Sequence, residues 1–200
     1  MQQSFLVSAK SIVVVSASRT GSTLVWHNLH RHFIFEFPVF HTHNALVDVA
    51  ADQMVVISRR QNNFDTIVSN LVGQHTKEFD KYTGKNIGSF FVSKDKFEKT
   101  FWYVMCHQHI TQTRFTEAVI VDFEPLINDS LYLFGLFDIA KETDYPFSQQ
   151  SPHRACDLIE NYVECKSWFS QLKEETLCQT MMANFISVLK QMNADNCQHK

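Results

Sequence analysis

The amino-acid sequence predicts an α/β protein, and three observations support this. Apolar runs rich in β-branched residues occur at 12–15, 54–57 and 118–123. Segments with apolar residues at helical spacing lie between these runs. Buried strands that alternate with helices are typical of a parallel sheet covered on both faces. We therefore expect three layers, with a central sheet of about four or five parallel strands between helices.

Composition limits the class of protein. A chain of 200 residues, 44% hydrophobic and 20% charged, is expected to fold as one soluble domain over residues 1–200. A net charge of −3 predicts no general attraction to nucleic acid or to an anionic membrane. Five cysteines without a CxxC pair, together with the lack of a secretory signal pattern or a membrane-spanning run, favour a cytoplasmic protein.

The first half of the chain predicts two helices and three strands. A strand at 12–15 is followed by a helix at 22–33, a strand at 37–42 and a strand at 54–57. Pro38 lies at the start of its strand, where a missing N–H does little harm. A helix at 64–75 is expected, with Asn62 or Asn63 as its cap.

The second half is more helical. Residues 77–88 are polar and include two glycines, so we expect a loop that closes over a bound acceptor. A helix at 97–115, entered through Ser93 or Asp95, precedes the strand at 118–123. Pro125 is expected in the first turn of the next helix, which should end near Gly135. A last helical region at 156–192 is expected to break near 166–172.

The loop after the first strand carries the clearest sign of function. Five residues follow the strand and lead directly into the helix, namely Arg19, Thr20, Gly21, Ser22 and Thr23. Such a loop directs backbone N–H groups and hydroxyls at one point, with the positive end of the helix dipole behind them. This arrangement suits a phosphate or sulfate group. A tight βα turn without a ligand is the alternative, because turn chemistry alone explains Gly21 and a Ser or Thr cap.

Polar side chains also follow the next two strands. His41 and His43 end the second strand, and Arg59 and Arg60 end the third, with Ser69 on the following helix. Ligands of parallel sheets bind at the carboxyl ends of the strands, so these groups are expected to lie near the first loop. Two arginines with a hydroxyl nearby predict a second anion site.

These motifs resemble those of the sulfotransferase family that uses 3′-phosphoadenosine 5′-phosphosulfate. In that family, a basic residue followed by Ser/Thr-Gly-Thr/Ser-Thr/Ser holds the phosphosulfate, and residues 19–23 match this pattern. The likeness covers residues 12–69 well and 118–164 loosely, where 121–126 resemble a strand followed by an acidic helix start. The resemblance implies a P-loop NTPase-like fold of sulfotransferase type and transfer of a sulfuryl group to a hydroxyl or amine.

The resemblance also implies roles for individual residues. His43 corresponds to the catalytic base of the family's Lys-Thr-His motif, and Arg19 to the basic residue of the phosphosulfate loop. Arg59 or Arg60, with Ser69, corresponds to the site of the 3′-phosphate. The expected ligands are 3′-phosphoadenosine 5′-phosphosulfate and its product 3′,5′-phosphoadenosine. The expected acceptor is a small molecule or a glycan.

Two positions depart from the family pattern. Leu24 stands where a Trp often stacks on adenine, and His41 stands where a Lys is usual. These departures leave open a nucleotide-binding domain of the same fold without catalysis. A P-loop nucleotide kinase is a further alternative, although the GxxxxGK[ST] motif is absent. The histidines have no Cys or acidic partner at metal-ligand spacing, so no metal is expected. The sequence predicts no particular oligomeric state.

Overall fold

The computed structural model describes residues 9–33, 35–77, 88–129, 131–137 and 155–175. Within these ranges, one parallel sheet is formed by β1 (Ser11–Val15), β2 (Val39–Thr42), β3 (Gln53–Arg59) and β4 (Val119–Asp122). The order of the strands is β2-β1-β3-β4, and each neighbouring pair is parallel. Helices flank this sheet, so the predicted α/β class is confirmed.

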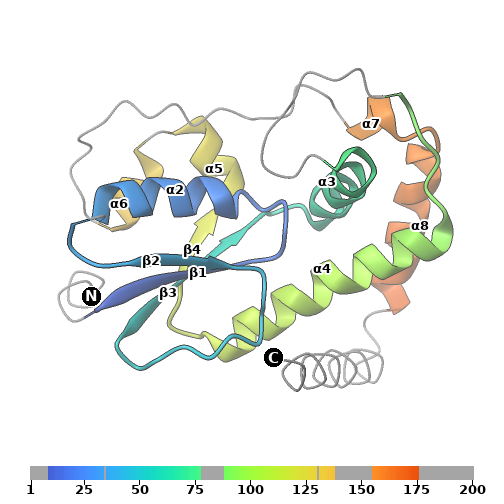
Figure 1. The fold of residues 1–200 in the computed structure, drawn as a ribbon. Coiled ribbons are helices and arrows are strands. Elements are labelled where there is room, and N and C mark those ends of the chain that lie inside the picture. Colours follow the sequence, from blue (N-terminus) through green and yellow to red (C-terminus); the bar gives the residue numbers. More distant parts are fainter. Residues whose placement is uncertain (1–8, 34, 78–87, 130, 138–154, 176–200) are drawn as a thin grey trace.

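The helices divide between the two sides of the sheet (Figure 1). Their bounds in chain order are α2 (Ser22–Phe33), α3 (Asn63–Thr76), α4 (Lys94–Arg114), α5 (Phe123–Asn128), α6 (Tyr132–Leu136), α7 (Ala155–Leu158) and α8 (Tyr162–Glu175). Helices α2, α5 and α6 lie along one face, and α4 runs along the other side. Helix α3 lies beyond the carboxyl ends of the strands, next to α7 and α8.

One core lies between the sheet and the first group of helices. Side chains alternate between the two faces of a strand, so Ile12 and Val14 of β1 share a face with Met54 and Val56 of β3. These residues pack against buried side chains of α2, α5 and α6, including Val25, Leu29, Leu126 and Leu133. The continuous burial of β1 explains why its sequence is apolar without alternation.

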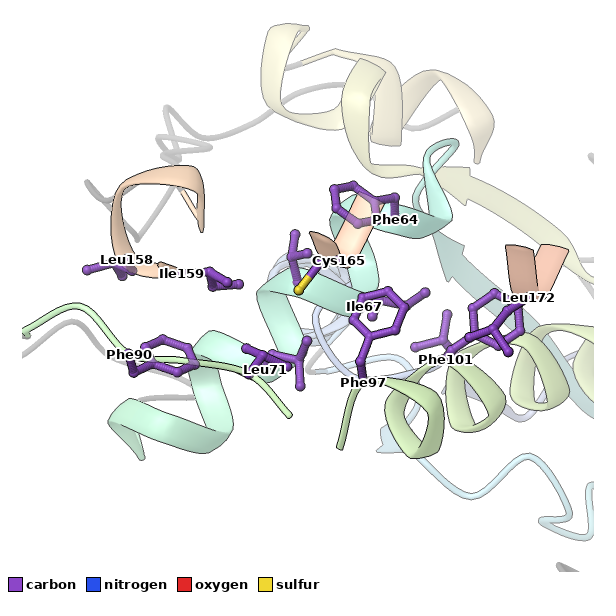
Figure 2. Packing of buried hydrophobic residues seen from close by; sticks show 13 residues of the cluster. Phe64, Ile67, Leu71, Phe90, Phe97, Phe101, Leu158, Ile159, Cys165 and Leu172 are labelled. Carbon is purple, nitrogen blue, oxygen red and sulfur yellow. The ribbon is translucent and has the colours of Figure 1, made fainter. Parts of the chain in front are cut away.

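A second core joins α3, α4, α7 and α8 (Figure 2). Phe97 and Phe101 of α4 are fully buried, as are Ile67 and Leu71 of α3. The chain before α4 closes this core, because Phe90 forms a parallel bridge to Ile159. The core therefore holds α3 in place at the end of the sheet where the predicted site residues lie.

The predicted helix caps are confirmed. The Asn62 side chain accepts a hydrogen bond from the N–H of Phe64 at 3.0 Å, and α3 begins at Asn63. The Ser93 hydroxyl accepts from the N–H of Lys96 at 3.3 Å, and α4 begins at Lys94. A polar side chain before an apolar periodic run thus located both helix starts, because it satisfies N–H groups that the helix cannot.

The start of the second strand and the length of the helix after the fourth strand differ from the prediction. The strand expected at 37–42 begins at Val39, because the Phe37 ring stacks on Phe33 and its N–H bonds back to the end of α2. Pro125 lies in the first turn of α5, as predicted, but the helix expected to continue to Gly135 is two short helices. Between them, the Asp129 carboxylate accepts from the N–H of Leu131 at 2.8 Å, which closes a turn.

The break expected near 166–172 does not occur, because α8 is continuous from Tyr162 to Glu175. The chain breaks instead before α8, where the Asn161 side chain accepts from the N–H of Val92 and donates to its carbonyl, each at 2.9 Å. The expected lid at 77–88 lies outside the described residues between 78 and 87, as does the last helical region beyond 175. Within the described part, no helix is long and apolar enough to cross a membrane.

Candidate functional site

The loop between β1 and α2 forms the centre of the candidate site. Arg19 and Gly21 have positive φ angles of 68° and 82°. The Thr20 hydroxyl donates to the carbonyl of Ala17 at 2.8 Å, and the Ser58 hydroxyl at the end of β3 donates to the carbonyl of Thr20 at 2.6 Å. Two left-handed residues and two hydroxyl bonds fix the path of the backbone. Such loops before a helix expose N–H groups suited to an anion.

Both the φ angle at position 21 and the atoms next to it require a glycine there. A Cβ placed on Gly21 would overlap the ring of Phe123, the first residue of α5. The loop therefore approaches α5 with only a hydrogen atom between them. Phe123 belongs to the site, and nothing in the sequence indicated it.

Substitution of Gly21 by Ala is expected to destabilise the protein by about 1–3 kcal/mol and to displace the loop. The backbone strain and the overlap with Phe123 act together, so part of the loss should be recovered in a Gly21→Ala, Phe123→Ala double variant. Chemical denaturation of the three variants measures this. Gly135→Ala is the matched control, because a Cβ there meets no atom within 4 Å, and its stability should not fall. Equal losses for Gly21→Ala and Gly135→Ala would contradict the close contact.

The end of β2 brings two histidines to the loop. His43 Nδ1 lies 2.8 Å from the carbonyl oxygen of Ser16, directly after β1. A carbonyl only accepts, so Nδ1 carries the proton and Nε2 is the basic nitrogen. As a whole residue, His43 is exposed. His41 Nε2 lies 3.0 Å from the Ser22 hydroxyl, and its ring meets that of His43 edge to face at 4.7 Å.

Helix α4 supports this arrangement from the other side. His107 is buried, and its Nε2 donates to the backbone carbonyl of His43 at 3.1 Å. Burial lowers the pKa of His107 to about 4, so its ring is neutral at pH 7. The Tyr103 hydroxyl lies 3.4 Å from that of Ser18. Sequence reasoning placed α4 correctly but missed both contacts, because a tertiary approach to a loop has no local signal.

Arg59 and Arg60 are adjacent in the chain but have different environments. Arg59 pairs with Asp122, its cross-strand neighbour in the β3–β4 register, at 2.6 Å. This hydrogen bond raises the pKa of Arg59. The guanidinium of Arg60 lies 4.3 Å above the ring of Phe123, and its Nη1 donates to the carbonyl of Asp65 at 3.3 Å. Arg59 therefore joins two strands, whereas Arg60 faces α3.

Ser69 lies on α3, one turn after Asp65. Its hydroxyl accepts a hydrogen bond from Arg19 Nε at 3.1 Å. The next residue, Asn70, donates to the carbonyl of Ser18 at 2.9 Å and so ties α3 to the same loop. The Ser69 hydroxyl was predicted to share an anion site with Arg59 or Arg60, and in the structure it is bonded to Arg19 of the first loop.

The structure brings the predicted residues to one end of the sheet. Those in the first loop and the start of α2 are Arg19, Thr20, Gly21, Ser22 and Thr23, and those from later elements are His43, Arg59, Arg60 and Ser69. Arg59 differs from the other predicted residues, because its guanidinium already forms an ion pair with Asp122. Among the described residues, no group of three or more His, Cys, Asp or Glu is placed to hold a metal ion.

The arrangement places groups of a kind that suits an anion near a histidine base. Arg19 and Arg60 are both bonded to α3, and the His43 Nδ1 bond to Ser16 leaves Nε2 with the lone pair. A loop of this kind before a helix suits a phosphate or sulfate group. Comparison of the chain with family models, with curated proteins and with solved structures gave no match.

Proposed function

We propose that this protein is a sulfotransferase with a P-loop NTPase-like fold of sulfotransferase type. It would transfer a sulfuryl group from 3′-phosphoadenosine 5′-phosphosulfate to a hydroxyl or amine of a small molecule or glycan. The observation that carries the proposal is the hydrogen bond between His43 Nδ1 and the carbonyl of Ser16. It fixes a basic nitrogen beside a loop suited to a phosphate or sulfate group.

The donor's charged groups fit the residues present. Arg60 Nε is buried and has no hydrogen-bond partner among the described residues, and its guanidinium faces α3. A buried donor without a partner is costly, and an anionic oxygen would satisfy it. We assign Arg60 rather than Arg59 to the 3′-phosphate, because Asp122 already neutralises Arg59. The bound donor supplies the electrophilic sulfur and a phosphate leaving group.

The chain's own residues supply the remaining chemistry. His43 Nε2 takes the proton of the acceptor hydroxyl or amine as the acceptor's bond to sulfur forms and the bond from sulfur to the bridging phosphate oxygen breaks. The N–H groups of residues 19–23 and the Ser22 hydroxyl stabilise the negative charge that gathers on the leaving oxygen. His107 holds the backbone of His43 and keeps the base in place.

The proposal is tested with two nucleotides that differ only in the 3′-phosphate. Adenosine 3′,5′-bisphosphate is expected to bind roughly ten- to hundred-fold more tightly than AMP, because a charge-assisted contact to the second phosphate contributes about 1.5–3 kcal/mol. Substitution of Arg60 by Gln should remove this preference. Isothermal titration calorimetry of both proteins with both nucleotides measures it.

The neighbouring residue provides the control. Arg59→Gln removes a guanidinium one position away, so it should lower stability through the loss of the Asp122 pair and retain the preference for the bisphosphate. Equal affinity of the wild-type protein for both nucleotides would contradict the proposal. Loss of the preference in Arg59→Gln but not in Arg60→Gln would reverse the assignment.

A nucleotide-binding domain without catalysis is a second candidate, favoured by the contact of His41. Its Nε2 is bonded to the Ser22 hydroxyl, in the position where the family that this chain resembles carries a lysine. A lysine would supply an ammonium group with three N–H donors at this point, whereas an imidazole has at most two. Preferential binding of the bisphosphate without sulfuryl transfer to any acceptor would favour this candidate.

A further inference from the structure

We propose that Arg19, Arg60 and Ser69 form one anion site against α3, in which both guanidinium groups contact the same phosphate or sulfate group. The inference rests on the proposed function only for the identity of the ligand. In this arrangement the Arg19 side chain contacts the 3′-phosphate and not the phosphosulfate that the loop holds. The loop would then hold its own anion through backbone N–H groups and hydroxyls alone.

The contacts of α3 place the two arginines on one face of that helix. Arg60 Nη1 donates to the carbonyl of Asp65, and Arg19 Nε donates to the hydroxyl of Ser69. Asp65 and Ser69 are four residues apart, and in an α-helix the carbonyl of one residue accepts from the N–H of the residue four positions later. The two groups that the arginines contact therefore lie on the same side of one turn of α3. A tetrahedral oxyanion between the two arginines could accept charge-assisted hydrogen bonds from both guanidinium groups.

The backbone of Arg19 supports the same assignment. Its φ of 68° is left-handed, which is uncommon for a residue other than Gly, Asn or Asp. Residues in such conformations persist only where the surrounding structure holds them, and they are frequent at active sites and ligand-binding loops. Here the side chain reaches α3, and Asn70 on the same helix bonds to the carbonyl of Ser18 next to it.

The charges around Arg60 leave it suited to an anion. Phe123 packs under its guanidinium at 4.3 Å and holds it without neutralising it. Burial lowers the pKa of Arg60, Asp65 and Glu124 raise it, and the charge of Arg19 lowers it further. The two carboxylates are near, yet neither forms an ion pair with Arg60 among the described residues. A bound oxyanion would offset the repulsion between the two arginines and satisfy the Nε of Arg60.

The test uses inorganic sulfate, so that it does not depend on the nucleotide. Sulfate is titrated calorimetrically in a chloride-free, low-salt buffer into wild-type, Arg19→Gln, Arg60→Gln and double-variant protein. Each single substitution should weaken the tightest sulfate site roughly ten-fold or more. The double variant should bind no more than about three-fold more weakly than the poorer single variant, because residues that act on one ligand group are not additive.

Two further variants separate binding from folding. Ser69→Ala removes only the hydroxyl that holds Arg19. It should therefore lower the sulfate affinity of the wild-type protein and have little further effect on that of the Arg19→Gln protein. Arg114→Gln is the matched control, because this arginine lies at the end of α4 and bonds to the carbonyl of Ala45. Its sulfate affinity should equal that of the wild type.

The outcomes distinguish this inference from the proposed function. Three results would overturn the shared site. The first is a double variant whose loss of sulfate affinity equals the product of the two single losses. The others are an Arg19→Gln protein with wild-type sulfate affinity and a wild-type protein that binds no sulfate. If the losses of sulfate affinity in the two single variants do not multiply in the double variant, and the protein does not prefer the bisphosphate over AMP, the shared site is retained and the proposed donor is rejected. If the protein prefers the bisphosphate over AMP but the two single losses of sulfate affinity multiply in the double variant, the proposed donor is retained and the shared site is rejected.

Discussion

Replacement of His43 by Gln is expected to lower the rate of sulfuryl transfer by about 10²–10⁴-fold, with little change in nucleotide affinity. The physical reason is that the base acts on the acceptor's proton and not on the nucleotide. Glutamine retains a donor that can reach the carbonyl of Ser16, which His43 Nδ1 contacts at 2.8 Å, and lacks the basic nitrogen. Steady-state turnover and calorimetric nucleotide binding, measured on the same preparation, separate the two effects.

His109→Gln is the control for this experiment. His109 lies on α4 two residues after His107 and is exposed, so the substitution changes a histidine without touching the loop. Turnover should then equal that of the wild type. An active His43→Gln protein would show that His43 is structural, held by Ser16 and by the bond from His107 to its carbonyl.

Substitution of Phe101 by Ala is expected to destabilise the protein by about 3–5 kcal/mol. Phe101 is fully buried in the core that joins α3 to α4 and α8, and its ring meets Phe169 edge to face at 5.8 Å. Truncation removes the apolar contacts of the ring and leaves a cavity that the neighbouring helices fill only in part. Urea denaturation followed by circular dichroism measures the free energy of unfolding.

Val163→Ala provides the comparison, because Val163 on α8 is 79% exposed and its truncation should change stability by less than about 0.5 kcal/mol. Since the core containing Phe101 holds α3, nucleotide affinity should also fall as the Phe101→Ala protein unfolds. A Phe101→Ala loss as small as that of Val163→Ala would mean that this core does not belong to the cooperative folding unit.

Local sequence signals predicted most of the fold. The β-branched run at β1, the Asn62 and Ser93 caps and the helical spacing of α3 each depend on interactions within a few residues. The errors occurred where distant contacts decide. The break before α8 is set by the bonds of Asn161 to Val92, which lies 69 residues earlier in the chain.

The candidate site shows the same division. Parallel strands end at one edge, so the residues after β1, β2 and β3 were predicted to come together from the strand pattern alone. The partners within that edge were not predicted. Arg59 is held by Asp122 on β4, and Ser69 is bonded to Arg19 instead of to Arg59 or Arg60.

The sequence by itself determined the α/β class, the loop that precedes α2 and the three strand ends that carry His43, Arg60 and their neighbours. These follow from apolar periodicity and from residue types that favour turns and caps, which act over one or two turns of chain. Only the tertiary structure decided which nitrogen of His43 is basic, which arginine faces α3, and that Phe123 packs against Gly21. Each of these depends on a contact between residues far apart in the chain, and such contacts form only when the sheet register and helix packing place the two side chains together.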